Sequence, residues 1–322
     1  MNFVTFSQLN ADIIRCIGML PREIDLVVGI PRSGMLVANM ISLYLNKPLC
    51  DIDSFLERTV YRSGSTKSTA RWKIDFREMR NVLVVEDSVC SGKSILAAKE
   101  RIEAACVSDK KMIYLAAYVW KKDASFVDCY FRAIDLPRAF EWNYLHIKLL
   151  ESTCFDIDGV LCEDPTPEQN DDGVRYLEFL RNATPKFLPT QKIGCIVTSR
   201  LEKYRKETEE WLSTHGIEYN ALYMMNVASA EKRRKMGNHA EFKAKVYKQR
   251  NNMIFFVESE ERQAADICRI SGKAVFCPTN QRFYDESVVT KSANWIKSFL
   301  YPYVPRFLLA LYRKMKRWAK FQ

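Results

Sequence analysis

Histidine and long apolar runs are scarce in this chain of 322 residues. Only three histidines occur, and none of the ten cysteines belongs to a C-x-x-C pair, so the sequence predicts neither a zinc site nor a disulfide framework. The longest uninterrupted apolar run, residues 112–120, has nine residues and indicates a strand, because a membrane span needs about twice that length. The N-terminus lacks the basic region and apolar core of a signal peptide. These absences favour a cytoplasmic protein.

The most informative segment is residues 82–94, VLVVEDSVCSGKS, in which an apolar strand leads into two acids and then into a loop of small and hydroxyl-bearing residues. Glu86 and Asp87 can accept hydrogen bonds from a pair of vicinal hydroxyls, while the amides and hydroxyls that open the following helix can hold a phosphate. A Walker A loop would need glycine where Asp87 stands. The pattern therefore indicates a site for a phosphorylated ribose, with an ordinary buried strand and turn as the alternative.

This segment resembles the phosphoribosyl pyrophosphate (PRPP) loop of type I phosphoribosyltransferases. The resemblance implies that PRPP is a substrate and that one run of nine residues binds it: Glu86, Asp87, Ser88, Val89, Cys90, Ser91, Gly92, Lys93 and Ser94.

A second strand and loop, residues 25–34, reads DLVVGIPRSG and precedes a helix expected from about Met35 to Leu45. Loops that follow parallel strands meet at the carboxyl edge of the sheet, where ligands bind. The position resembles the pyrophosphate loop of the same family, with Pro31, Arg32, Ser33 and Gly34 as its binding residues.

Two further segments of the first half have open interpretations. Residues 58–71 are polar and basic and resemble the mobile lid of these transferases, although a plain surface loop fits the composition equally well. The segment 139–146 would close the domain near residue 150, with Phe140 and Trp142 either beside the acceptor or in an interdomain core.

The second half opens with residues 152–161, STCFDIDGVL, which place Asp156 and Asp158 after a short apolar strand and Gly159 at a turn. This resembles the first motif of the haloacid dehalogenase (HAD) superfamily. The resemblance implies that Asp156 attacks phosphorus, and that Asp158 protonates the leaving oxygen and later activates water.

The remaining motifs of that superfamily follow in order. The strand 193–200 ends in Thr198 and Ser199, of which Thr198 is the preferred ligand of the phosphoryl group. Lys243, with Lys245 as the competing choice, would balance the negative charge. Glu258 ends a further strand, and the resemblance implies a Mg²⁺ cofactor bound by Asp156, Asp158 and Glu258.

These motifs predict an α/β protein of two Rossmann-like domains. Residues 1–150 would form the phosphoribosyltransferase domain and residues 151–290 a HAD-like phosphatase domain, with only a small cap between its first two motifs. Residues 291–322 would form a basic amphipathic helix, because residues 295–322 contain seven basic residues and no acid. Such a helix suits the anionic inner face of a membrane, although a packed terminal helix is an alternative, and no nucleic-acid motif accompanies the charge.

The combination suggests a function in two steps. The first domain would transfer 5-phosphoribosyl from PRPP to an acceptor, for which our hypothesis is a lipid-linked glycan in surface polysaccharide synthesis, and the second would remove the 5-phosphate to leave ribofuranose. One alternative is a nucleobase phosphoribosyltransferase fused to a nucleotidase. Another is a transferase whose second domain is regulatory and not catalytic. The sequence does not distinguish the acceptor, the anomeric configuration of the product or the oligomeric state.

Overall fold

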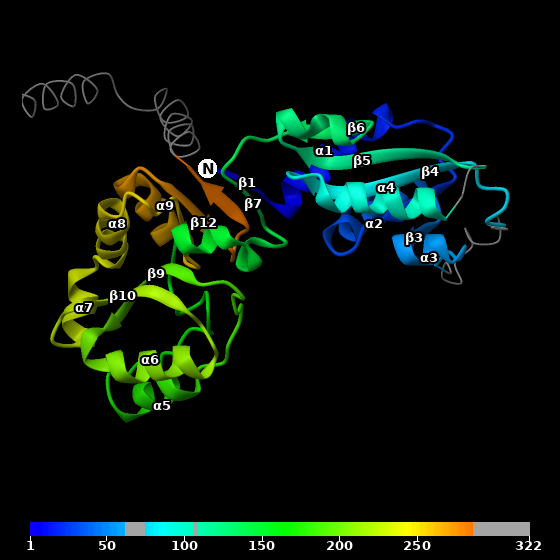
Figure 1. Ribbon diagram of the computed structural model, residues 1–322. Helices are drawn as coiled ribbons and strands as arrows, with labels where there is room; N and C mark the ends of the chain where they lie inside the picture. Colours follow the sequence, from blue (N-terminus) through cyan, green and yellow to red (C-terminus); the bar gives the residue numbers. More distant parts are fainter. Residues whose placement is uncertain (62–74, 106–108, 286–322) are drawn as a thin grey trace, which may run out of the picture. The chain divides into compact units, whose positions relative to one another are not determined.

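The chain divides into two units, residues 1–143 and 144–322, and the computed structural model describes residues 1–61, 75–105 and 109–285 (Figure 1). The division falls between Asn143 and Tyr144, whereas the sequence predicted a boundary near residue 150. Residues 144–152 belong with the second unit because Leu150 is buried there and the ring of Tyr144 contacts Phe276, 5.5 Å away. The predicted lid and the predicted basic tail lie largely or wholly outside the described residues.

The first unit contains a five-stranded parallel sheet in the order β3-β2-β4-β5-β6 (Figure 1). Its main elements are, in chain order, β1 (Asn2–Val4), α1 (Phe6–Cys16), β2 (Leu26–Gly29), α2 (Ser33–Leu45), β3 (Leu49–Asp51), α3 (Ile52–Leu56), β4 (Asn81–Val89), α4 (Lys93–Ala104), β5 (Lys111–Val119), β6 (Cys129–Ala133) and β7 (Arg138–Phe140). Short 3₁₀ turns η1 (Ile17–Met19) and η3 (Lys121–Phe126) complete it.

Helices cover both faces of this sheet, which explains the unbroken apolar runs of its strands. Leu83 and Val85 of β4 pack with α1 and α2, whereas Val82 and Val84 pack with α3 and α4 on the opposite face. Strand β5 coincides with the apolar run that the sequence identified.

A separate pair of strands joins the two ends of the first unit. Strand β1 pairs in parallel with β7, so that Asn2 lies opposite Arg138 and Val4 opposite Phe140. The two strands are more than 130 residues apart in the chain, and no local pattern predicted their pairing.

The second unit contains a six-stranded sheet in the order β10-β9-β8-β11-β12-β13, in which only β13 is antiparallel to its neighbour (Figure 1). Its main elements are β8 (Thr153–Phe155), α5 (Val174–Asn182), β9 (Ile193–Leu201), α6 (Arg205–Thr214), β10 (Tyr219–Met225), α7 (Ala230–Met236), α8 (His239–Gln249), β11 (Phe255–Val257), α9 (Glu261–Ser271), β12 (Ala274–Cys277) and β13 (Arg282–Tyr284). The 3₁₀ turns are η4 (Tyr144–His146), η5 (Lys148–Ser152) and η6 (Glu202–Tyr204).

Strand β8 lies near the middle of this sheet, between β9 and β11. The core on one face of the sheet is apolar, and there Val197 of β9 and Phe256 of β11 pack against Tyr247 of α8 and Ile267 of α9. Parallel strands flanked by helices confirm the α/β prediction for the described ranges. None of the helices in these ranges combines the length and the apolar character that a membrane crossing requires.

Candidate functional site

The two predicted phosphate loops of the first unit lie side by side because β2 and β4 are neighbouring parallel strands, with Gly29 opposite Val85. Gly34 allows the close approach of the first loop to β4. A Cβ at that position would lie 2.7 Å from the carbonyl oxygen of Val85 and 3.2 Å from the Cα of Glu86. The peptide bond between Pro31 and Arg32 is cis, and both residues are exposed at the loop.

The acid pair lies inside β4 and not after it, since this strand continues to Val89. Both acids are buried, at 5% exposure for Glu86 and 6% for Asp87. The Ser94 hydroxyl donates to Oε2 of Glu86 at 2.6 Å, and the Asp87 amide donates to its Oε1 at 3.1 Å. Burial raises the pKa of Glu86 to about 8, and burial also raises the pKa of Asp87. These carboxyl groups therefore hold protons more tightly than ordinary acids do.

The predicted PRPP-binding residues that follow the two acids include both buried and exposed side chains. Val89 and Gly92 are buried, whereas Cys90, Ser91 and Lys93 are exposed. Gly92 has a φ of 72° and caps α4, so its left-handed backbone turns the chain from the strand into the helix. The open loop before this helix can receive a phosphate.

Two contacts from residues 138–142 to the end of β4 were not predicted. The Trp142 indole N–H donates to Oδ2 of Asp87 at 2.7 Å, and the Arg138 guanidinium donates to the carbonyl oxygen of Val89 at 2.7 Å. Trp142 thus packs within the first unit. The sequence placed Trp142 in the closing segment 139–146, either beside the acceptor or in an interdomain core, but gave no signal of its contact with Asp87. Arg138 had no signal either, since a single arginine beside a strand usually lies in solvent.

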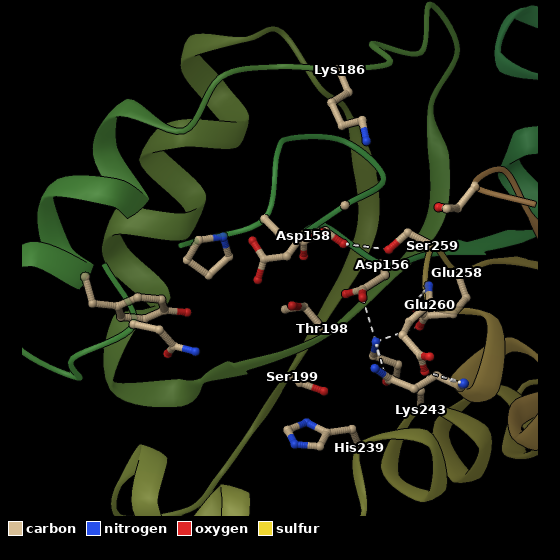
Figure 2. Close-up of a pocket in the computed structure, with 17 residues that line it drawn as sticks. Asp156, Asp158, Lys186, Thr198, Ser199, His239, Lys243, Glu258, Ser259 and Glu260 are labelled. Carbon is tan, nitrogen blue, oxygen red and sulfur yellow. Dashed lines mark hydrogen bonds and ion pairs between the residues drawn. The ribbon is translucent and has the colours of Figure 1, made fainter. Parts of the chain in front are cut away.

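In the second unit, the predicted residues Asp156, Thr198 and Glu258 lie at or near the carboxyl ends of three adjacent strands, β8, β9 and β11. They line one pocket of about 570 Å³ together with Asp158 and Lys243. Figure 2 shows these five side chains around the pocket, with Ser199 and His239 on its border. The structure therefore brings the predicted phosphatase residues together.

Lys243 occupies the centre of this group. Its ammonium donates to Oδ2 of Asp156 at 2.5 Å and to Oε2 of Glu258 at 2.6 Å (Figure 2). Lys245 instead forms an exposed ion pair with Glu241 on α8, so the geometry favours Lys243 in the choice that the sequence left open.

Burial and charge act in opposite directions on these groups. Burial raises the pKa of Glu258 to about 7 and also raises that of Asp156, in both cases against the charge of Lys243. Burial lowers the pKa of Lys243, but its two ion pairs outweigh burial and raise it above its ordinary value. The ammonium therefore remains charged beside the predicted nucleophile.

Asp158 has a partner that the sequence did not reveal. Arg200 is fully buried, and its Nη2 and Nε donate to Oδ1 of Asp158 at 2.6 and 3.1 Å. Within the described ranges, no cluster of three histidine, cysteine, aspartate or glutamate side chains is arranged as a metal site. The predicted metal set is thus not assembled through its side chains, because the Asp158 carboxylate turns to Arg200.

The remaining donors still suit Mg²⁺. The carboxylates of Asp156 and Glu258 reach the same ammonium, and the backbone carbonyl of Asp158 lies on the loop beside Ser259, whose hydroxyl is 3.3 Å away. Carboxylate and carbonyl oxygens are hard donors, which are those that Mg²⁺ prefers. The residues present therefore fit the ion.

Comparisons with known proteins identify a family for the first unit. Residues 6–130 match the family model described as the phosphoribosyl transferase domain. A search of curated proteins found no match to the chain. Among solved structures, the chain is similar to a xanthine-guanine-hypoxanthine phosphoribosyltransferase of Helicobacter pylori, with 15% identity, a TM-score of 0.35 and coverage of 44% of this chain and 93% of that one. A purine phosphoribosyltransferase from Pyrococcus horikoshii has 18% identity, a TM-score of 0.32 and coverage of 44% and 95%. The family match carries the assignment of the domain, since these structural similarities are too low to add to it.

Proposed function

Since residues 6–130 are a phosphoribosyltransferase domain, we propose that the chain transfers 5-phosphoribosyl from PRPP to an acceptor hydroxyl and that its second unit then removes the 5-phosphate. The observation that carries this proposal is the presence, in one chain, of the acid pair beside a phosphate loop and of a pocket that gathers Asp156, Lys243 and Glu258. The product of the first reaction carries a phosphate monoester, which is the substrate class that the second pocket suits.

In the first unit, the two acids would accept hydrogen bonds from the vicinal hydroxyls of the PRPP ribose. The amides of residues 90–94 would hold its 5-phosphate at the start of α4, where the helix dipole and free amides favour anions. Pro31 to Gly34 would hold the pyrophosphate that leaves, with Arg32 supplying charge. The resemblance of the loops and the adjacency of β2 and β4 support these roles.

In the second unit, the Asp156 carboxylate would attack phosphorus, so that an oxygen–phosphorus bond forms as the bond to the ribose oxygen breaks. A water molecule would later cleave the aspartyl phosphate to release inorganic phosphate. Lys243 would balance the charge of the nucleophile and the phosphoryl group, and Thr198 would bind a phosphoryl oxygen. The strand order, with Asp156 after the central β8, Thr198 in β9 and Glu258 after β11, supports the HAD-like interpretation.

The Asp158 carboxylate would handle the proton of this reaction, and Arg200, which donates to both of its oxygens, would hold it in place. Mg²⁺, held by the carboxylates of Asp156 and Glu258 and the Asp158 carbonyl, would supply charge neutralisation at the phosphoryl group.

The acceptor is proposed from the chemistry at the C-terminus. Residues 295–322 combine seven basic residues with an apolar stripe and no acid, which suits an anionic membrane surface. An enzyme at the inner face of the cytoplasmic membrane would meet lipid-linked glycans, whose free hydroxyls accept glycosyl groups. A ribofuranosyl group in a surface polysaccharide is the product that this sequence of reactions would leave.

The test incubates the protein with PRPP, Mg²⁺ and lipid-linked glycan acceptors, with nucleobases as the competing acceptor class. Mass spectrometry then distinguishes addition of ribose from addition of ribose phosphate. The proposal predicts ribose on the glycan for the natural chain and ribose phosphate for Asp156→Asn. Ribose phosphate on a nucleobase alone, or the same dephosphorylated product from Asp156→Asn, would contradict it.

A further inference from the structure

Trp142, in the predicted closing segment 139–146, contacts Asp87 of the proposed PRPP site. It follows β7, and its indole N–H donates to Oδ2 of Asp87 at 2.7 Å. The contact spans 55 residues of sequence. Asp87 is one of the two carboxylates proposed to bind the ribose hydroxyls, so the indole bonds a carboxylate that would contact the substrate.

The ring of Trp142 is held in place by other aromatic residues. Its centroid lies 5.0 Å from that of Phe140 in a stacked arrangement and 5.8 Å from that of Phe6. Phe140 in turn stacks on Tyr118 of β5 at 5.4 Å, and Tyr118 is fully buried. The indole is thus anchored to the core of the unit, and its N–H has a fixed direction.

Backbone contacts fix the same segment on its other side. The Glu141 amide donates to the carbonyl oxygen of Val4, and the Phe6 amide donates to Oε2 of Glu141 at 2.7 Å. One residue on, Trp142 meets Asp87, while Arg138 at the start of β7 meets the carbonyl oxygen of Val89. The segment 138–142 therefore contacts the end of β4 through two hydrogen bonds.

We propose that Trp142 is a positioning residue of the PRPP site, whose indole N–H orients the Asp87 carboxylate toward a ribose hydroxyl. This inference rests on the proposed function of the first unit. The indole N–H bonds Oδ2 of Asp87 and so fixes the direction in which the carboxylate faces. A donor on Oδ2 also favours the ionised carboxylate, which is the form that accepts a hydrogen bond from a hydroxyl.

The pH dependence of PRPP binding provides a readout that packing alone does not move. The charged groups that act on Asp87 are Glu86 on β4 and Arg138 on β7. Burial raises the pKa of Asp87 and the Trp142 hydrogen bond lowers it, so loss of the N–H should raise this pKa further. PRPP binding by a variant without the N–H should then require a higher pH.

The experiment measures the Kd of PRPP with Mg²⁺ by calorimetry from pH 6.5 to pH 9. Trp142→Phe keeps an aromatic ring and removes the donor, and we expect binding to weaken about tenfold near neutral pH and by less at pH 9. Phe6→Leu is the matched control, because Phe6 packs on the same ring without touching Asp87, and it should show no pH-dependent loss. In an Asp87→Asn background, Trp142→Phe should change Kd by less than about twofold.

Each outcome is decisive. The positioning role would be overturned if Trp142→Phe weakened PRPP binding equally at every pH, or if Phe6→Leu weakened it as much. It would also be overturned if Trp142→Phe weakened binding in the Asp87→Asn background as much as in the natural chain. Absence of PRPP binding by the natural chain would instead contradict the proposed function. Should Trp142→Phe not fold, the natural chain labelled with ¹⁵N-tryptophan gives a second test. Of its six indole signals, the one that moves in Asp87→Asn should also move when PRPP binds, and a signal unmoved by PRPP would contradict the role.

Discussion

Glu86 combines burial with a chemical role, and this has a measurable effect on stability. Its pKa is raised by burial from 4.5 to about 8, so the folded unit binds the proton more tightly than the unfolded chain does. The stabilisation from this proton is complete below pH 4.5 and is lost as the pH rises through about 8.

Glu86→Gln should therefore unfold like the natural chain at pH 5 and be more stable at pH 9, by roughly 1–3 kcal/mol. Thermal unfolding at the two pH values measures this, with Glu78→Gln, an exposed acid of the same unit, as the control. An equal shift at both pH values would mean that the ionised carboxylate is not costly at this site.

Arg200 makes Asp158 a structural residue as well as a candidate catalytic one. Removal of the Asp158 carboxylate leaves a fully buried guanidinium without its ion partner, which typically costs 3–5 kcal/mol. We expect Asp158→Asn to destabilise the second unit by about 3 kcal/mol, and the double variant Asp158→Asn with Arg200→Met to regain most of this. Thermal denaturation measures both. Arg205→Met, which breaks a surface pair with Glu202, should cost less than about 1 kcal/mol.

This prediction matters for assigning chemistry to Asp158. A loss of phosphatase activity in Asp158→Asn implicates proton transfer only if the variant remains folded at the assay temperature. If the double variant is folded and still inactive, the carboxylate itself is needed. A stability of Asp158→Asn equal to that of the natural chain would show that Arg200 finds another partner.

At the scale of secondary structure elements, strand β1 holds the segment that contacts the proposed PRPP site. It pairs with β7, and β7 leads directly into Trp142. Deletion of residues 2–4 should weaken PRPP binding severalfold, because the segment that holds Asp87 loses its backbone partner. Asn2→Ala, which removes only a rim contact to Asp135, should leave binding unchanged. Calorimetry measures both, and unchanged affinity after the deletion would show that β7 keeps its place without β1.

At the scale of the whole molecule, the two units carry separate sets of residues, so their activities should be separable. Asp156→Asn should lower hydrolysis of a generic phosphate ester by roughly 10³-fold or more while leaving the Kd of PRPP unchanged. Asp87→Asn should instead weaken PRPP binding while leaving the hydrolysis of the phosphate ester unchanged. Colorimetric phosphatase assays and calorimetry on the same preparations measure the pair. Loss of both functions in either folded variant would contradict the two-site description.

The sequence by itself located the strands and loops that carry the chemical groups, which are β2 and β4 in the first unit and β8, β9 and β11 in the second. Each signal is local: an apolar run followed by acids, small residues or a turn, as at Asp87 and Asp156, reports on a few neighbouring residues. The resemblance of these motifs to the HAD superfamily also predicted that Asp156, Thr198 and Glu258 would meet, and parallel strands bring their carboxyl ends to one edge.

The tertiary structure alone decided the contacts between distant residues. Trp142 reaches Asp87, Arg200 reaches Asp158, and Lys243 instead of Lys245 faces Asp156. It also decided that β4 continues past its acids, because β5 pairs with it as far as Val89. Such partners depend on how helices and strands pack in three dimensions, and local patterns of sequence do not encode contacts between distant segments.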